Sequence, residues 1–260
     1  MDKLFAVGNY LKYRIKSGTA HDVHSPFVFD LLNNVIHDQA QFYCYGPLES
    51  LRSKLLLDQR TIQVSDFGAV STGKKVTKKI STIAKNSLQE KKYAQLIFRL
   101  VNFSNAKNIL ELGTSLGLTT LYIANAAKKS RIITMEGCPE IAKIAIENFD
   151  KMKCKNIELV IGNFNETLPK TLSSIEQVDL VYFDGNHRKQ ATLDYFKLCL
   201  TKKTADSVFI FDDIYWSREM KAAWDEIIRN ENVTVSIDLF KLGIVFFRSG
   251  IPKQHFRLKF

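Results

Sequence analysis

Length, composition and charge place this chain among ordinary globular proteins. It has 260 residues, of which 45% are hydrophobic and 25% are charged, so collagen-like, disordered and disulfide-scaffold classes are excluded. The 37 Lys and Arg residues outnumber the 27 Asp and Glu residues, which gives a net charge of +10. A surface of this charge should attract anions such as phosphates, nucleic acid or acidic lipid.

The cysteines and the N-terminus predict a cytoplasmic protein. Four widely spaced cysteines, none in a Cys-x-x-Cys pair, are expected to be reduced. The first residues mix charges into an apolar run without a small-residue cleavage site, and no segment reaches 18 uncharged apolar residues. We therefore expect neither an export signal nor a membrane span.

Residues 1–90 are expected to form a helical N-terminal region. Apolar residues recur at helical spacing through residues 4–36 and again through residues 80–100, whereas glycines and small residues interrupt the pattern at 66–75. Seven lysines and one acid lie within residues 74–92. A solvated lysine-rich face explains this segment, with an RNA-binding segment as the alternative. We place a domain boundary near residue 90.

Residues 91–260 predict an α/β domain, because short β-rich runs alternate with amphipathic helices. The strands are expected at 108–112, 131–136, 156–161, 178–184, 207–213, 234–239 and 243–248. About three residues separate the last two runs, which is too few for a parallel crossover, so they should form an antiparallel hairpin. The pattern predicts a Rossmann-like, seven-stranded, mostly parallel sheet with a C-terminal antiparallel hairpin.

A glycine-containing turn follows the strand expected at 108–112. Glu111 and Gly113 precede Thr114 and Ser115, and Gly117 opens the next helix. Such a turn brings backbone donors and a helix start beside a ligand. The acid suits a cationic ligand that carries sulfonium and ammonium groups better than a pyrophosphate, and the third glycine of the dinucleotide fingerprint is missing. A purely structural tight turn is the alternative.

Two further strand ends carry candidate ligand-binding residues. Glu136 ends the strand at 131–136, where its carboxylate can accept hydrogen bonds from both hydroxyls of a ribose. Asn163 and Phe164 follow the strand at 156–161 and could offer an amide and an aromatic face to an adenine ring. A surface glutamate and a simple turn before a helix are the alternatives.

These segments together resemble a known family. The runs ELGTSLGLTT, ITMEG, IGNFNETLP, VYFDGNH and FIFDDIYW follow the order, spacing and strand-end positions of class I S-adenosylmethionine-dependent methyltransferases. Within that superfamily the chain looks most like the small-molecule O-methyltransferases related to catechol and caffeoyl-CoA O-methyltransferases, which hold a divalent cation. The resemblance spans about residues 90–250 and leaves residues 1–90 outside it.

The resemblance also implies roles for strand-end residues near the C-terminus. Asp184 takes the position of the first metal-binding carboxylate and is expected to serve both the cofactor and catalysis. Asp212 and Asp213 fall where the family has Asp-Asn, so all three aspartates are the predicted ligands of Mg²⁺ or a similar cation. Asp213 departs from the family's asparagine, which leaves open a different ligand set or no metal. Solvated aspartates that cap the following helices are the alternative.

The expected reaction is methyl transfer from S-adenosylmethionine to a small hydroxylated acceptor. His187 stands where the family has its catalytic lysine and is the predicted general base, because imidazole takes up a proton near neutral pH; an ordinary histidine at the start of a helix is the alternative. Trp216 is expected to pack in the core, with a wall of the acceptor site as the alternative, and the N-terminal region is expected to cover that site. The alternatives are an RNA methyltransferase that uses residues 74–92, a catalytically silent cofactor-binding module and, less favoured, an NAD-dependent dehydrogenase. A homodimer is left open.

Overall fold

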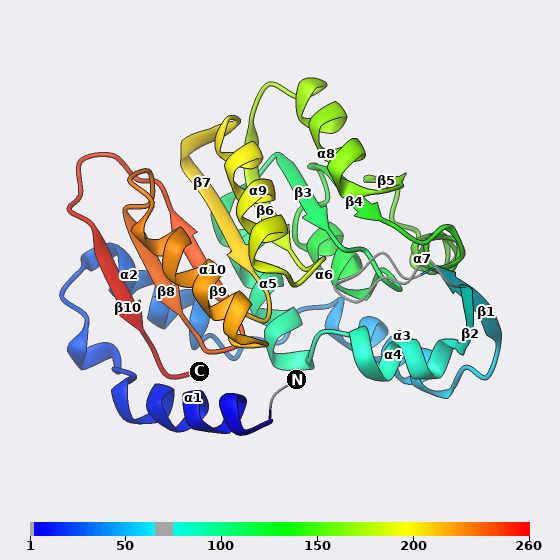
Figure 1. Cartoon of the computed structure of the whole chain (residues 1–260), viewed down its shortest axis with the longest axis horizontal. Coiled ribbons are helices and arrows are strands. Elements are labelled where there is room, and N and C mark those ends of the chain that lie inside the picture. Colours follow the sequence, from blue (N-terminus) through cyan, green and yellow to red (C-terminus); the bar gives the residue numbers. More distant parts are fainter. Residues whose placement is uncertain (1–2, 66–74) are drawn as a thin grey trace. The chain divides into compact units, whose positions relative to one another are not determined.

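The computed structural model describes residues 3–65 and 75–260, which fall into two compact units. The central unit comprises Ala40–Glu176, and the terminal unit comprises Met1–Gln39 together with Gln177–Phe260. Figure 1 labels their elements. The terminal unit is therefore discontinuous in sequence. The boundary predicted near residue 90 falls inside the central unit, between two helices, and stays a prediction.

The central unit contains three parallel strands, a hairpin and six helices among its described residues. In chain order these are α3 (Tyr45–Leu57), β1 (Thr61–Ser65), β2 (Lys75–Lys79), α4 (Ile80–Ser87), α5 (Lys91–Ser104), β3 (Asn108–Leu112), α6 (Leu118–Ala126), β4 (Arg131–Glu136), α7 (Pro139–Lys151), β5 (Ile157–Ile161) and α8 (Phe164–Ser173). Strand β4 pairs in parallel with both β3 and β5. The first three predicted strands are therefore confirmed to within one residue.

The hairpin of β1 and β2 was not predicted from the sequence. The two strands are antiparallel, with Thr61 opposite Lys79. Ile62 and Val64 alternate toward a core shared with α3, α4 and α7, which is the signal of a half-buried strand. Two such residues are too few to distinguish a strand from the end of a helical pattern.

The terminal unit contains five strands and the remaining helices. Its elements are α1 (Lys3–Lys16), η1 (Ala20–Asp22), α2 (Pro26–Leu31), η2 (Leu32–Ile36), β6 (Val178–Phe183), α9 (Lys189–Leu200), β7 (Lys203–Phe211), α10 (Arg218–Arg229), β8 (Val235–Asp238), β9 (Gly243–Phe246) and β10 (Gln254–Arg257). Strands β6 and β7 are parallel, and β9 runs antiparallel to both β7 and β8. The predicted C-terminal hairpin is confirmed. Strand β10, which pairs in parallel with β8, is an eighth sheet strand that was not predicted.

Aromatic side chains fill the interior of the terminal unit. Phe183 and Phe211, from neighbouring strands, stack with ring centroids 4.4 Å apart. Trp224 of α10 is buried against Gly243 at the start of β9, where an added Cβ would lie 2.5 Å from the indole ring. Glycine is therefore required there for close packing. In Figure 1, α9 and α10 lie across the face of β6, β7, β8 and β9.

The two ends of the chain meet within the terminal unit. The Tyr13 hydroxyl of α1 donates a hydrogen bond to the Leu258 carbonyl at 2.5 Å, and Gly18 pairs with Leu258 in an isolated parallel bridge. Figure 1 shows α1 beside the C-terminal end of the chain. The fold is α/β and Rossmann-like, with eight strands in a mixed, mostly parallel arrangement and helices at the N-terminus, which confirms the predicted class.

Candidate functional site

The glycine loop, residues 113–117, connects β3 to α6 in a tight left-handed path. Gly113, Ser115 and Gly117 have φ values of 107°, 48° and 78°. The N–H groups of Gly113 and Thr114 both donate to the Met135 carbonyl of β4, at 3.0 Å each. These amides are therefore used to fix the loop against the neighbouring strand, and the predicted turn is present in the central unit.

Glu136 lies at the carboxyl end of β4, directly beside the glycine loop. Its Oε2 accepts a hydrogen bond from the Ser115 N–H and its Oε1 one from the Cys138 N–H, each at 2.9 Å. Burial raises the pKa of Glu136, whereas these backbone donors act to lower it. Because a carboxylate oxygen can accept two hydrogen bonds, each oxygen retains capacity for a ligand hydroxyl.

Glu111 occupies a different environment, although it was predicted to contact the same ligand. Its side chain is fully buried, and Oε2 accepts hydrogen bonds from the hydroxyls of Thr120 at 2.5 Å and Thr134 at 2.6 Å. Oε1 has no hydrogen-bond partner among the described residues. Burial raises the pKa of Glu111 to about 7, so protonation competes with the charge that an ammonium partner would require.

Helix α7 holds the glycine loop through two residues that sequence reasoning missed. The buried Asn148 donates from Nδ2 to the Leu116 carbonyl at 2.9 Å. The Phe149 ring packs against Gly117 so closely that an added Cβ would lie 2.5 Å from the ring. The available signal was a single asparagine on the apolar face of a helix, and it does not identify its partner.

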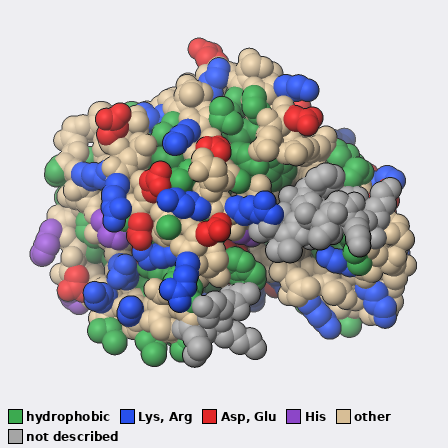
Figure 2. Space-filling model, in the orientation of Figure 1, with side chains coloured by type: hydrophobic (Ala, Val, Ile, Leu, Met, Phe, Trp, Pro, Cys, Tyr) green, Lys and Arg blue, Asp and Glu red, His purple; other side chains and the backbone are tan. Residues whose placement is uncertain are grey.

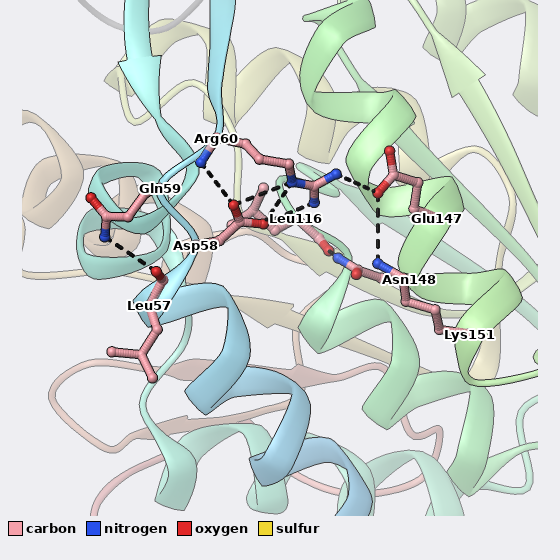
Figure 3. A network of polar contacts seen from close by, with 8 residues as sticks. All are labelled: Leu57, Asp58, Gln59, Arg60, Leu116, Glu147, Asn148 and Lys151. Atoms are coloured by element: carbon pink, nitrogen blue, oxygen red, sulfur yellow. Dashed lines mark hydrogen bonds and ion pairs between the residues drawn. The ribbon is translucent and has the colours of Figure 1, made fainter.

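A polar network ties α7 to the segment that precedes β1 (Figure 3). Arg60 binds Asp58 at 2.8 Å and Glu147 at 3.0 Å, and Lys151 lies 3.6 Å from Glu147. Arg60, Glu147 and Lys151 are exposed, whereas Asp58 is partly buried, so the ion pairs contribute little stability individually. They link α7, beside Asn148, to the segment before β1.

Asn163 and Phe164 lie where β5 passes into α8. The Asn163 side chain accepts a hydrogen bond from the Asn165 N–H at 3.0 Å and thus caps α8. Gly162 donates its N–H to the Glu136 carbonyl at 2.9 Å, which places this turn next to the end of β4. This cap corresponds to the alternative role of Asn163, a turn before a helix. The contact of Asn163 with adenine stays a prediction.

Asp184 and His187 follow β6 in the terminal unit. The His187 Nε2 lies 3.7 Å from the Asp184 Oδ1, and the Tyr182 hydroxyl donates to the Asp184 Oδ2 at 3.2 Å. About a quarter of the His187 side chain is exposed, at 27%. Burial lowers the pKa of His187, while the charge of Asp212 acts to raise it. The imidazole is therefore accessible, and burial favours its neutral, proton-accepting form.

Asp212, Asp213 and Trp216 follow β7. Asp212 is buried, and its Oδ1 has no hydrogen-bond partner among the described residues. Asp213 adopts a left-handed backbone with φ of 51°, and its carbonyl accepts the Trp216 N–H. The exposed Trp216 ring lies 6.3 Å from the His187 ring, between centroids.

The aspartates do not act as the helix caps that formed the alternative reading. The N-cap position of α9 is Arg188, which makes no side-chain cap, and the Ser217 side chain caps α10. Residues 3–65 and 75–260 also contain no group of three or more His, Cys, Asp or Glu side chains that could hold a metal ion. Asp213 therefore does not complete a three-carboxylate group with Asp184 and Asp212.

The segment of lysines at 74–92 is not interleaved with exposed aromatic residues. Lys74 lies outside the described residues, whereas Lys79, Lys85, Lys91 and Lys92 are exposed. Tyr93, the aromatic residue at the end of this segment, is buried in α5. Stacking on single-stranded RNA requires exposed aromatic faces, so the segment offers no such platform within its described part.

A Rossmann-like sheet, a glycine loop after its first core strand and an acid at the end of the next strand define the class I S-adenosylmethionine-dependent methyltransferases. A family described as "Methyltransferase domain" matches residues 110–214. The chain is similar to methyltransferases of this class and, among them, to catechol O-methyltransferases.

Curated relatives show the same similarity. A catechol O-methyltransferase of Niastella koreensis is 29% identical over 186 residues, covering 70% of this chain and 76% of the relative. A catechol O-methyltransferase of Mycobacterium tuberculosis is 27% identical over 111 residues, covering 42% of this chain. The chain spans about half of that second relative, at 49% of its length.

Solved structures support the fold. An O-methyltransferase from Bacillus cereus, in complex with SAH, superposes with a TM-score of 0.58 at 17% identity, over 88% of this chain and 97% of that one. The O-methyltransferase TomG from Streptomyces achromogenes, in complex with SAM, superposes with a TM-score of 0.56 at 17% identity, over 63% of this chain and 82% of that one. Within the described part of the chain, every helix is too short or too polar to cross a bilayer.

Proposed function

We propose that this chain transfers the methyl group of S-adenosylmethionine to a hydroxyl oxygen of a small acceptor. The observation that carries the proposal is the Glu136 carboxylate, held by the N–H groups of Ser115 and Cys138 at the edge of the glycine loop. A carboxylate fixed in this way can accept both hydroxyls of a ribose without reorganising. The catechol O-methyltransferase relatives favour an oxygen acceptor over nitrogen or carbon.

The central unit supplies the groups for the cofactor. S-adenosylmethionine, when bound, supplies a methyl group that its sulfonium has already activated. Glu136 accepts the ribose hydroxyls, and Gly113 and Gly117 permit close approach of the backbone to the ligand. Glu111 attracts the ammonium group when ionised, and Asn163 with Phe164 holds the adenine. All of these groups bind or orient, so their effect on the rate comes through positioning.

The terminal unit supplies the groups for the acceptor. The neutral His187 imidazole accepts the hydroxyl proton as the oxygen bonds to the methyl carbon and the bond from that carbon to the cofactor sulfur breaks, which leaves a neutral thioether. Asp184, 3.7 Å from His187, then stabilises the resulting imidazolium. The exposed Trp216 ring lies near His187 and provides an apolar wall for the acceptor. This arrangement gives Asp184 a role in catalysis that does not depend on a metal.

A divalent cation fits two of these aspartates. The buried Asp212 Oδ1 lacks a partner among the described residues, and carboxylate oxygens suit Mg²⁺, which commonly binds through one or two carboxylates and keeps several waters. Asp184 and Asp212 would hold the ion, which would lower the pKa of the acceptor hydroxyl. Asp213 is not needed in such a set.

Calorimetry with S-adenosylmethionine tests the cofactor site directly. Glu136→Gln should weaken binding by about ten- to a hundredfold, because removing a charged hydrogen-bond partner costs about 1.5 to 3 kcal/mol. Glu158→Gln on the neighbouring strand β5 is the matched control, since Glu158 is exposed and pairs with Arg131. Unchanged affinity of Glu136→Gln, or equally tight binding of NAD to the native chain, would contradict the proposed function.

Turnover of a catechol-type acceptor tests the acceptor site. His187→Ala should lower the rate by about 10²- to 10⁴-fold, as expected for a general base, while cofactor affinity stays unchanged. His24→Ala, which alters an exposed histidine of the same unit, should leave the rate unaffected. Chelation should abolish turnover if a cation is required. Adding Mg²⁺ should then no longer raise the turnover of the Asp184→Asn variant. Full activity in chelator would restrict the mechanism to His187 and Asp184.

A further inference from the structure

Helix α1 presents an apolar stripe to solvent. Val7, Leu11 and Ile15 are 58%, 56% and 82% exposed. Residues four apart lie nearly above one another on a helix, so these three side chains occupy about 80° of its circumference. An aliphatic stripe of this kind is unusual on a free surface and indicates a binding face.

The opposite face of α1 already attaches the helix to the terminal unit. Tyr13 is buried, and its hydroxyl bonds to the Leu258 carbonyl. The Tyr10 and Tyr13 rings contact Phe240 with centroids 5.1 and 5.3 Å apart. Because these contacts hold the helix, the exposed stripe is not needed for packing within the described chain.

Basic residues flank the stripe. Lys12, Arg14 and Lys16 are exposed, and none forms an ion pair with another described residue. The helix sequence from residue 3 to residue 16 contains no acid. Figure 2 shows green hydrophobic side chains next to blue basic ones at the lower left, over α1. The face therefore combines aliphatic side chains with uncompensated positive charge.

We propose that α1 docks this protein onto a membrane surface that carries anionic lipid headgroups. An amphipathic helix with basic flanks lies in the interface plane, with its apolar side chains among the upper acyl chains and its cations at the headgroups. A groove of a partner protein is not favoured, because it would enclose more of the circumference of α1 than the terminal unit leaves free. A second copy of this chain would bring the same cations together without acids on the helix, and RNA would require aromatic rather than aliphatic contacts.

Co-sedimentation of the full chain with vesicles tests the proposal. The native chain should bind vesicles that contain phosphatidylglycerol far better than vesicles of phosphatidylcholine alone, and added salt should weaken the binding. The double variant Leu11→Glu, Ile15→Glu should bind neither kind of vesicle. Lys12→Gln, Arg14→Gln and Lys16→Gln together should lower binding to the anionic vesicles by roughly a hundredfold, since each surface cation contributes about fivefold.

Leu57→Glu provides the matched control, because Leu57 is 75% exposed at the end of α3 and lies outside this face. It should bind vesicles like the native chain. Equal binding to neutral and anionic vesicles, or native binding by the Leu11→Glu, Ile15→Glu variant, would overturn the proposal. Light scattering that shows a native dimer and a monomeric Ile15→Glu variant, without vesicle binding, would assign the face to a second copy. None of these measurements depends on methyl transfer.

Discussion

Two glutamates 25 positions apart in the sequence show how much the surroundings of a residue decide. Glu136 meets two backbone donors at the edge of the glycine loop, whereas Glu111 is enclosed with two threonines and one unpartnered oxygen. Burial raises the pKa of Glu111 to about 7. When the pKa of an acid is higher in the folded than in the unfolded protein, its contribution to the stability is most favourable below the pKa of the unfolded state. This contribution is lost as the pH rises to the pKa of the folded state.

Glu111→Gln should therefore stabilise the protein more at pH 8 than at pH 5. The native chain loses about 3 kcal/mol across the interval between the two pKa values, and glutamine does not titrate. Urea unfolding of both proteins at each pH measures the difference, which should change by about 2 to 3 kcal/mol. If the free energies of unfolding of the two proteins differed by the same amount at both pH values, the raised pKa of Glu111 would be contradicted. Weaker S-adenosylmethionine binding by the stabilised variant would support Glu111 as the ammonium partner.

Site residues were predictable where strand order alone places them. Glu136 ends β4 and Asp212 directly follows β7, so the alternation of strands and helices located both without knowledge of packing. Asn148 was not predictable, because its partner Leu116 lies 32 residues away and is recognised through a carbonyl that any residue could provide. A hydrogen bond to a backbone carbonyl does not depend on the type of the partner residue, so the sequence does not indicate it.

At the scale of elements, the glycine loop and α7 behave as one packed unit. Gly117 has φ of 78° and lies against Phe149, whereas Gly250 has φ of 75° with no atom within 4 Å of an added Cβ. Gly250→Ala should cost only the left-handed strain, about 1 to 2 kcal/mol. Gly117→Ala should cost about 1 to 3 kcal/mol more because of the collision.

Denaturant unfolding of the two alanine variants measures this difference in the free energy of unfolding. The Gly117→Ala variant should also bind S-adenosylmethionine more weakly, since Phe149 or the loop must move. Equal costs at the two positions would show that the ring moves aside freely.

Element types were predictable in the order of their length and periodicity. The core strands β3 to β9 were recognised because apolar runs alternate with amphipathic helices, and the short connection between β8 and β9 required a hairpin. Strand β10, Gln254–Arg257, contains no fully buried residue, unlike β8 and β9, so its sequence has no apolar run. The segment is a strand because it pairs with β8. This is a tertiary contact, which the spacing of residues in the sequence does not indicate.

At the scale of the whole molecule, one buried carboxylate joins three segments of the terminal unit. Asp238 is fully buried and accepts hydrogen bonds from the Tyr215 hydroxyl at 2.7 Å, the Arg257 Nε at 3.0 Å and the Phe240 N–H at 2.9 Å. The Phe240 ring in turn contacts the tyrosines of α1. The C-terminal strand, the β8 turn and the N-terminal helix therefore depend on one charge pair.

Arg257→Met should lower the stability by about 3 kcal/mol, because it leaves the Asp238 carboxylate without its cation. Thermal and denaturant unfolding measure the loss. Arg229→Met, at an exposed position, should have little effect, and Asp238→Asn combined with Arg257→Met should recover at least part of the loss. A single variant as stable as the native chain would show that Tyr215 and the Phe240 N–H satisfy Asp238 alone.

The closure of the two chain ends has a consequence for the order of folding. Helix α1 is synthesised before residues 40–176, whereas Leu258, to which Tyr13 bonds, is synthesised after them. The contiguous residues 40–176 form a compact unit whose contacts are available while the ribosome is still translating. Contacts across 245 residues carry the largest loop-closure entropy and form last. The exposed aliphatic helix must therefore wait without this partner until residue 258 has left the ribosome, and during that time a nascent-chain chaperone can bind it.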